Sequence, residues 1–302
     1  MNLEQIYLES TNGIALFLLA SMVIDLIVSL VSGLKAYKGK ETLANYGVFA
    51  LYLASRKLVW DGLFLSMMLA CNTIAPAALS PDSLWVWALA FVGVDFLYYI
   101  DHRIGHEVNA IWSFHSVHHS SEEYNIGVTG RISFIEGIYR WVFLAPLALI
   151  GVPAYMILLT KVVSRLYQVW VHTNLDRGKL EALSGILVTP GLHRVHHGSN
   201  EHYLDKNYGA IFSVWDRMFN TYQKPDVAPT YGLINPINTR NPLKINTVVL
   251  VKNIQETFRI KGFTEKIRFL LVKPGAFVEK TSSQLNMYTF SEEQTPKNKL
   301  SV

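Results

Sequence analysis

Long apolar segments separated by short polar ones fill the first hundred residues of this chain. Residues 13–34 form the first apolar segment, about 22 residues long, which is enough for a helix to cross the ~30 Å of bilayer hydrocarbon. A second segment follows residue 47 and is interrupted by Arg56 and Lys57, and a third covers 84–100. This pattern predicts three membrane-spanning helices.

A fourth apolar region, 141–170, is divided by the sequence Gly-Val-Pro at 151–153. Glycine and proline punctuate helices, so we predict a helical hairpin. Its first arm has about ten apolar residues, too few to span a bilayer alone. The arm therefore either extends back to Phe134 or belongs to a hairpin that dips into the membrane and returns. Further along, 247–260 is expected to form an amphipathic helix that lies on the membrane.

We therefore expect an all-α integral membrane bundle with about four membrane helices or hairpin arms and a cytoplasmic helical cap. Basic residues precede or interrupt the second span, and the positive-inside rule places that side in the cytoplasm. The third span then delivers the first histidine to the cytoplasmic side, so a multi-pass protein with a cytoplasmic site is predicted. The expected regions are N-terminal membrane helices at 1–83, a histidine-bearing region at 84–222, a membrane-associated segment at 223–280 and a disordered tail at 281–302.

Composition supports the membrane interpretation and narrows the chemistry. Half of the 302 residues are hydrophobic and only 17% are charged, against about 25% in ordinary soluble domains. The net charge of +4 is modest, and we expect no nucleic-acid partner. Cys71 is the single cysteine, so no internal disulfide and no cysteine-ligated cluster are expected. No HExxH or CxxCH motif is present, which argues against a zincin protease and an attached haem.

All ten histidines lie between residues 102 and 202, and most belong to three motifs. The motifs are His102-x3-His106, His115-x2-His118-His119 and His193-x2-His196-His197. Residues three or four apart share a helix face, so each motif can direct two or three imidazoles at one point. Imidazole suits iron, copper and zinc. Eight ligands exceed one tetrahedral zinc and favour two metal ions that keep an open position for dioxygen. His172 is a further candidate ligand.

Polar side chains near these motifs are candidates for supporting roles. Asp95 precedes His102 on the same helical stripe by about two turns, or ~10 Å, and is expected to orient a ligand from outside the metal site. Glu122 and Asn125 follow the second motif closely. They could orient a ligand or touch substrate, and an ordinary loop is an equally good interpretation. Asp101 and Glu107 point off the stripe, where salt bridges are expected.

At these motifs the chain resembles the fatty acid hydroxylase / sterol desaturase superfamily of integral-membrane diiron oxygenases, whose signature is HxxxH, HxxHH, HxxHH. Further stretches, WVHTNL (170–175), WDRMFNTY (215–222) and YGLINPINTRNPLKIN (231–246), resemble the alkylglycerol monooxygenase subgroup. The resemblance implies that 84–222 is the catalytic domain and that Glu122 is a site residue. The iron ligands that it implies are His102, His106, His115, His118, His119, His193, His196 and His197.

The activity implied by the resemblance is O2-dependent hydroxylation of an unactivated C–H bond of a lipid, at the ether-adjacent carbon of an alkylglycerol. Two iron ions and an external electron donor, tetrahydrobiopterin or another reductant, are the expected cofactors, and such sites also accept zinc. A hydroxylase or desaturase of a sterol, carotenoid, fatty-acyl or aminolipid substrate is the alternative. A metal transporter is a remote alternative, because only Asp25, Asp61 and Asp95 are acidic within the first three spans.

Overall fold

In the computed structural model, residues 3–33, 36–176 and 178–277 are described, and this part of the chain is helical without a β-strand. The predicted all-α fold is confirmed, while the predicted tail at 281–302 lies outside the described residues. The α-helices are α1 (Leu3–Val31), α2 (Gly39–Ser55), α3 (Asp61–Thr73), α4 (Leu84–Glu107), α5 (Asn109–His119), α6 (Ile126–Thr129), α7 (Gly137–Leu149), α8 (Ala154–Val171), α9 (Pro190–His196), α10 (Val214–Met218), α11 (Pro242–Arg259) and α12 (Phe263–Leu271).

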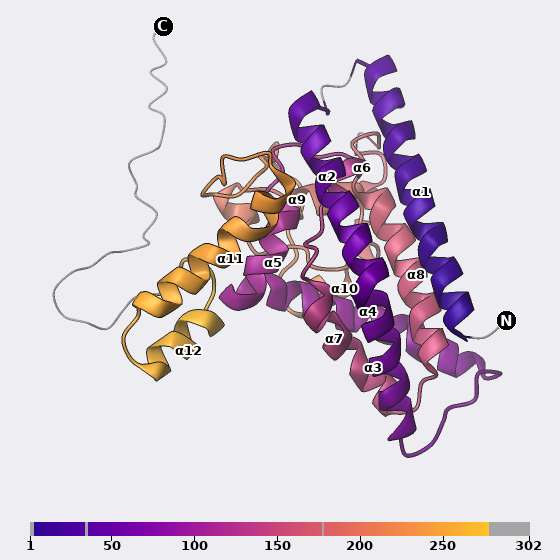
Figure 1. The fold of residues 1–302 in the computed structure, drawn as a ribbon. Coiled ribbons are helices and arrows are strands. Elements are labelled where there is room, and N and C mark those ends of the chain that lie inside the picture. The colour runs from indigo at the N-terminus through magenta and orange to yellow at the C-terminus, as the bar shows by residue number, and fades with distance from the viewer. Residues whose placement is uncertain (1–2, 34–35, 177, 278–302) are drawn as a thin grey trace, which may run out of the picture.

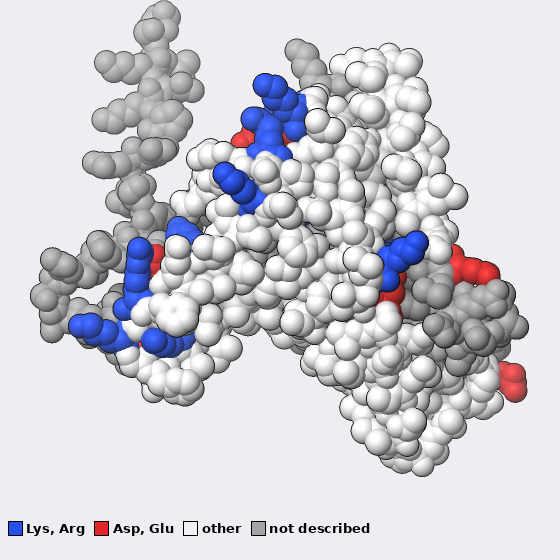
Figure 2. All heavy atoms as spheres, viewed as in Figure 1, with Lys and Arg blue, Asp and Glu red and all other residues white. Residues whose placement is uncertain are grey.

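Within the described residues, two helices are long and apolar enough to cross a membrane by length and composition: Asn12–Val31 within α1, and α4. On α1 the side chains of Leu16, Leu30 and Val31 are 68%, 68% and 84% exposed, a surface suited to lipid rather than to water. Figure 2 shows a largely uncharged body, with Lys and Arg gathered over α11–α12 and at the upper end of α2.

Helices α2 and α3 form one continuous stretch, joined by a π-helical turn at Arg56–Trp60. The structure thus corrects the expected placement of Arg56 and Lys57 beside the basic residues that precede α2. Arg56 lies 16 residues beyond Lys40 along this helix, or about 24 Å at 1.5 Å per residue. It forms an ion pair with Asp61, with Nε and Oδ1 3.0 Å apart.

The predicted hairpin is present as α7 and α8, which are joined by the turn at 151–153. Gly151 has a positive φ of 96°, a conformation that glycine adopts without a steric penalty. The Asn72 side chain fastens this turn to the end of α3, because its Nδ2 donates to the carbonyls of Ala148 and Val152, both at 2.9 Å. With 13 residues, α7 is about 20 Å long and remains too short to span a bilayer alone.

The apolar core lies where α3, α4, α7 and α8 pack together, and it includes Met68, Ala90, Leu147 and Ile157. A Cβ on Gly93 would lie 2.7 Å from Leu147, so glycine permits the close approach of α4 and α7. In Figure 1, α1 runs beside α8, and α11–α12 form an arm next to α5. The helix predicted at 247–260 is observed as α11.

Candidate metal centre

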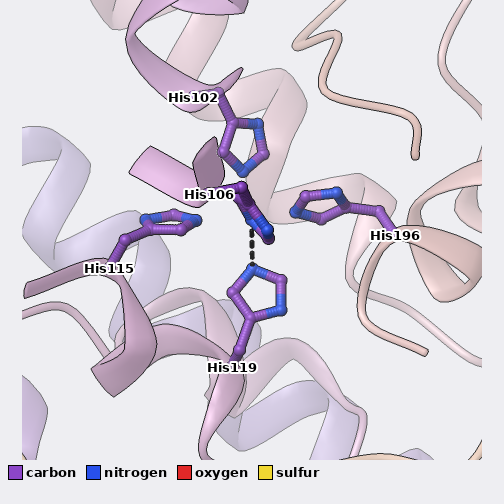
Figure 3. Close-up of side chains that lie close together, drawn as sticks. All are labelled: His102, His106, His115, His119 and His196. Carbon is purple, nitrogen blue, oxygen red and sulfur yellow. Dashed lines mark hydrogen bonds between the residues drawn. The ribbon is translucent and has the colours of Figure 1, made fainter. Parts of the chain in front are cut away.

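Nine of the ten histidines converge in two adjacent groups. The first comprises His102, His106, His115, His119 and His196, and the second comprises His118, His172, His193 and His197. In each group, one ring nitrogen per residue lies within 4.8 Å of the others. Figure 3 shows the five imidazoles of the first group converging on one point. The groups adjoin through His119 and His197, whose rings stack with centroids 4.4 Å apart.

Helical spacing explains how the motifs are divided between the groups. Residues four apart on a helix differ by only ~40° in direction, whereas adjacent residues differ by ~100°. His115 and His119 on α5 therefore face the first group, and His118 turns to the second. The same rule sends His193 and His197 to the second group and His196 to the first. Each HxxHH motif thus serves both groups, two imidazoles to one and one to the other.

The short helix α9 begins at Thr189 and Pro190, two residues that favour helix initiation. The Thr189 hydroxyl accepts a hydrogen bond from the Leu192 amide at 3.2 Å, and Pro190 occupies the first turn. A side-chain cap and an early proline both favour helix formation at this end. They hold the three histidines of the third motif in place despite the seven-residue length of α9.

Backbone carbonyls fix the orientation of several imidazoles through Nδ1. His102 Nδ1 lies 2.8 Å from the Tyr208 carbonyl, His172 Nδ1 lies 2.6 Å from that of Gln168, and His196 Nδ1 lies 2.8 Å from that of Lys206. A carbonyl can only accept, so the proton resides on Nδ1 and Nε2 keeps its lone pair.

Several buried imidazole nitrogens without a hydrogen-bond partner are available to bind a metal. Nε2 of His102, His115, His196 and His197 is buried without a hydrogen-bond partner in the described part of the chain. Burial also lowers the pKa of His172 to about 3 and that of His196 to about 4, so both are neutral near pH 7. Unprotonated, unpaired imidazole nitrogens in a buried cluster fit transition-metal ions with several nitrogen ligands each.

Two buried aspartates hold the loop that covers the first group. Asp216 accepts from the amides of Tyr208 at 2.7 Å and Gly209 at 2.9 Å. Asp95 accepts from the Ile211 amide and from Trp215 Nε1, both at 2.8 Å. Among the described residues, the hydrogen bonds of Asp95 go to this loop and to Trp215 and none goes to a histidine. Asp95 fastens the loop whose Tyr208 carbonyl orients His102.

A buried arginine ties α2 to the end of α5. Arg131 is fully buried and donates to Glu41 Oε1 at 2.9 Å, to Asn45 Oδ1 at 2.6 Å and to the Val117 carbonyl at 3.0 Å. Its own carbonyl lies 3.3 Å from His118 Nδ1. The ion pair therefore positions a residue that supports the second group.

The remaining predicted site residues lie outside both groups. Glu122 is exposed, and its carbonyl accepts from Lys38 Nζ at 3.3 Å. Asn125 is buried and donates to the Ala36 carbonyl at 2.7 Å. His202, the tenth histidine, pairs with Asp226 at 3.0 Å. Asp101 and Glu107 form the expected salt bridges, with Arg140 at 3.4 Å and Arg103 at 3.1 Å.

Sequence reasoning missed several supporting groups, among them Asp216, Arg131 and Glu136. Glu136 Oε1 lies 3.8 Å from His115 Nδ1 and 2.6 Å from an Arg140 nitrogen. Asp216 lies within the stretch 215–222 that had suggested a family resemblance, so a signal for it existed. Nothing in the local pattern around Arg131 or Glu136 distinguishes them from surface charges.

A cavity of about 120 Å³ adjoins the centre, between α1, the α2–α3 helix, α4, α7 and α8. Glu136 and Gln168 line it and also contact histidines of the first and second group, respectively. Tyr98 lines it too, with its ring centroid 5.3 Å from that of His102. A molecule bound in the cavity would therefore lie against the supports of both groups.

Comparisons of the sequence with known proteins identify relatives of this chain. The sequence profile of the family described as fatty acid hydroxylase matches residues 87–221. The alkylglycerol monooxygenase of Xenopus tropicalis is 36% identical over 84% of this chain and 56% of its own length. That of Homo sapiens is 40% identical over 64% of this chain and 43% of its own.

The ornithine lipid hydroxylase OlsE of Rhizobium tropici is 33% identical over 53% of this chain and 51% of its own length. No solved structure gives a significant match. The chain spans about half the length of the curated relatives that it matches.

Proposed function

Because the chain belongs to the fatty acid hydroxylase superfamily, we propose that it is a membrane monooxygenase that hydroxylates a lipid C–H bond with O2. The net reaction converts R–H, O2, two electrons and two protons into R–OH and water. The observation that carries the proposal is the pair of histidine groups, in each of which one ring nitrogen per residue lies within 4.8 Å of the others.

The nine histidines are proposed to hold two iron ions, five around one and four around the other. Iron would supply the redox chemistry that joins dioxygen reduction to C–H oxidation. The orphaned Nε2 atoms of His102, His115, His196 and His197 support this assignment. Zinc fits the same nitrogen ligands but lacks a redox step, so a zinc-loaded protein should be inactive.

The protein itself supplies orientation, neutrality and exclusion of water. Carbonyls of Tyr208, Gln168 and Lys206 keep the proton on Nδ1 of three ligands, which leaves Nε2 for the metal. Asp95 is proposed as a positioning residue that acts through the Tyr208 loop. We propose that Glu122 and Asn125 act beside the histidine groups and do not bind the metal ions.

The substrate is proposed to be an ether lipid of the alkylglycerol type, hydroxylated at the carbon next to the ether oxygen. The names of the relatives support this choice, and the ornithine lipid hydroxylase suggests an aminolipid as the second substrate to test. We propose tetrahydrobiopterin as the electron donor. Purified protein with iron, O2 and each lipid, with and without the pterin, should yield a product heavier by one oxygen atom.

We further propose a multi-pass topology with the histidine centre facing the cytoplasm. The apolar helices α1 and α4 support it, as do the basic residues Lys38 and Lys40 before and at the start of α2. Two single-cysteine variants in a Cys71→Ser background, one with cysteine at position 40 and one with cysteine at position 82, test the topology. Each is treated with a membrane-impermeant maleimide on intact cells. Labelling of position 82 alone is expected, and labelling of position 40 from outside would reverse the orientation.

The metal assignment has a direct test with a control that this chain provides. Iron content of the detergent-purified protein should be about two ions per chain, and a His118→Ala, His196→Ala double variant should lose most of it. His202→Ala removes the one histidine outside the groups, so it should retain wild-type iron. Iron that persists in the double variant, or one haem in place of two irons, would contradict the proposal.

A further inference from the structure

The cavity beside the histidine centre contains more basic than acidic side chains. Its wall includes Arg56, Arg140, Lys161 and Arg165, against Asp61, Asp101 and Glu136. All three acids have arginine partners. Asp61 pairs with Arg56 at 3.0 Å, and Arg140 pairs with both Asp101 at 3.4 Å and Glu136 at 2.6 Å.

The other two cations have no acidic partner in the described part of the chain. Lys161 Nζ lies 3.6 Å from the centroid of the Phe64 ring. Arg165 donates to the Tyr52 hydroxyl and to Gln168 Oε1, each at 3.4 Å. Neither residue forms an ion pair with a carboxylate among the residues described. Counted over the described lining residues, the cavity wall thus carries one formal positive charge in excess.

An uncompensated cation inside an apolar helical body is unfavourable, because burial removes its hydration without supplying a counter-charge. Lys161 and Arg165 are four residues apart on α8, so they share one face and both line the same cavity. A ligand with a single negative charge would neutralise the excess and satisfy the free donors of both side chains.

The residues along the cavity also give it a direction. On α8, moving away from His172, Gln168 and Arg165 come first, Lys161 follows, and Leu158 lies beyond them. On α7, Phe143 and Leu144 lie beyond Glu136 and Arg140 in the same way. The polar end of the cavity therefore adjoins the histidines, and the apolar end lies further from them.

From this arrangement we propose that the cavity binds an amphiphile through a carboxylate or phosphodiester group held by Lys161 and Arg165, with its hydrocarbon chain directed away from the histidines. Arg165 lies seven residues before His172, about 10 Å along the helix. In this pose the anionic group lies between the histidines and the hydrocarbon chain.

Ligand binding can be measured without catalysis, as the rise in melting temperature of the metal-free protein in a neutral maltoside detergent. The probes are myristate, myristyl alcohol and inorganic phosphate. Myristate should raise the melting temperature, and the alcohol and phosphate should do so much less. Equal effects of myristate and alcohol would overturn the role of the anion. Phosphate as effective as myristate would overturn the binding of an amphiphile.

Lys161→Met and Arg165→Gln test the two residues. Each should weaken myristate binding about tenfold or more, since each removes a charge-assisted hydrogen bond to the carboxylate of the ligand. Lys161→Met should also raise the melting temperature of the ligand-free protein, because it removes a partly buried cation that has no ion-pair partner among the described residues. A general loss of stability would lower the melting temperature, so it cannot produce weaker binding together with a higher melting temperature. Arg165→Lys keeps the charge and should restore most of the binding.

Lys57→Met serves as the control, since Lys57 is exposed beside Arg56 and does not line the cavity. It should bind myristate like the wild type. Wild-type binding by both Lys161→Met and Arg165→Gln would overturn the inference. Because the measurement needs neither iron nor turnover, its failure leaves the proposed oxygenase untouched, and absence of iron leaves this result standing.

Discussion

The buried pair of Arg131 and Glu41 offers the sharpest test of how the histidine centre is supported. The two side chains are 0% and 5% exposed, with Nη1 and Oε1 2.9 Å apart. Glu41→Gln preserves shape and removes the charge, which leaves the guanidinium buried beside neutral acceptors. Breaking a buried pair by removing one partner costs about 3–5 kcal/mol.

That loss can be converted into a melting temperature. Unfolding entropy is about 2.1 cal/mol/K per residue, so a chain of 302 residues has roughly 0.6 kcal/mol/K. Glu41→Gln should therefore melt about 5–8 °C below the wild type. Thermal unfolding in detergent, followed by circular dichroism, measures the shift.

The control removes an acid whose arginine partner is exposed. Glu256 pairs with Arg259 at 2.8 Å, and the Arg259 side chain is 72% exposed, so Glu256→Gln should change stability by about 0–1 kcal/mol. Arg131→Met, alone and combined with Glu41→Gln, completes a cycle whose expected coupling is about 2 kcal/mol. A Glu41→Gln protein that melts within the range of the Glu256→Gln control, with no coupling to Arg131→Met, would refute the reasoning.

Three further outcomes follow from the site. Asp216→Asn should lower iron occupancy several-fold without disturbing secondary structure, because it weakens the loop whose carbonyl orients His102; metal analysis beside circular dichroism checks this. Thr189→Ala should cost about 1 kcal/mol by removing the cap of α9, and a melting temperature equal to that of the wild type would contradict it. The metal-free protein should lose stability as pH falls from about 6.5 towards 4, since the unfolded chain binds protons there that His172 and His196, with lowered pKa values, do not. Melting temperatures measured across this range should fall with pH, and a flat profile would count against neutral, buried imidazoles.

Much of the architecture could be predicted from periodicity and residue type. The apolar runs indicated α1, α4 and the α7–α8 hairpin, because their lengths and breaks are local properties of the chain. The three histidine motifs indicated the centre for the same reason. Even the division between the groups follows from helical angles, since His115 and His119 must diverge from His118.

The supports of the centre could not be predicted, because they depend on contacts between distant segments. Arg131 meets Glu41 across 90 residues, with Nη1 and Oε1 2.9 Å apart. Asp95 meets the Ile211 amide across 116 residues at 2.8 Å. The π-helical turn at Arg56–Trp60 was also unexpected, and the length of α2 separates Arg56 from the basic residues before that helix. Contacts between such distant residues leave no local sequence pattern, because they form only when the helices pack together.

The two groups draw their histidines from α4, α5, the end of α8 and α9, and this distribution has a consequence for how the protein is made. When α4 leaves the ribosome, His102 and His106 have no partners, and His193 to His197 are synthesised some ninety residues later. Neither group can be complete before α9 docks, so a metal would be loaded late, onto helices that are already packed together. Metal binding would then lock an assembled bundle rather than nucleate it. On the proposed function, metal starvation during synthesis should accordingly leave a folded helical protein that binds iron when it is added afterwards.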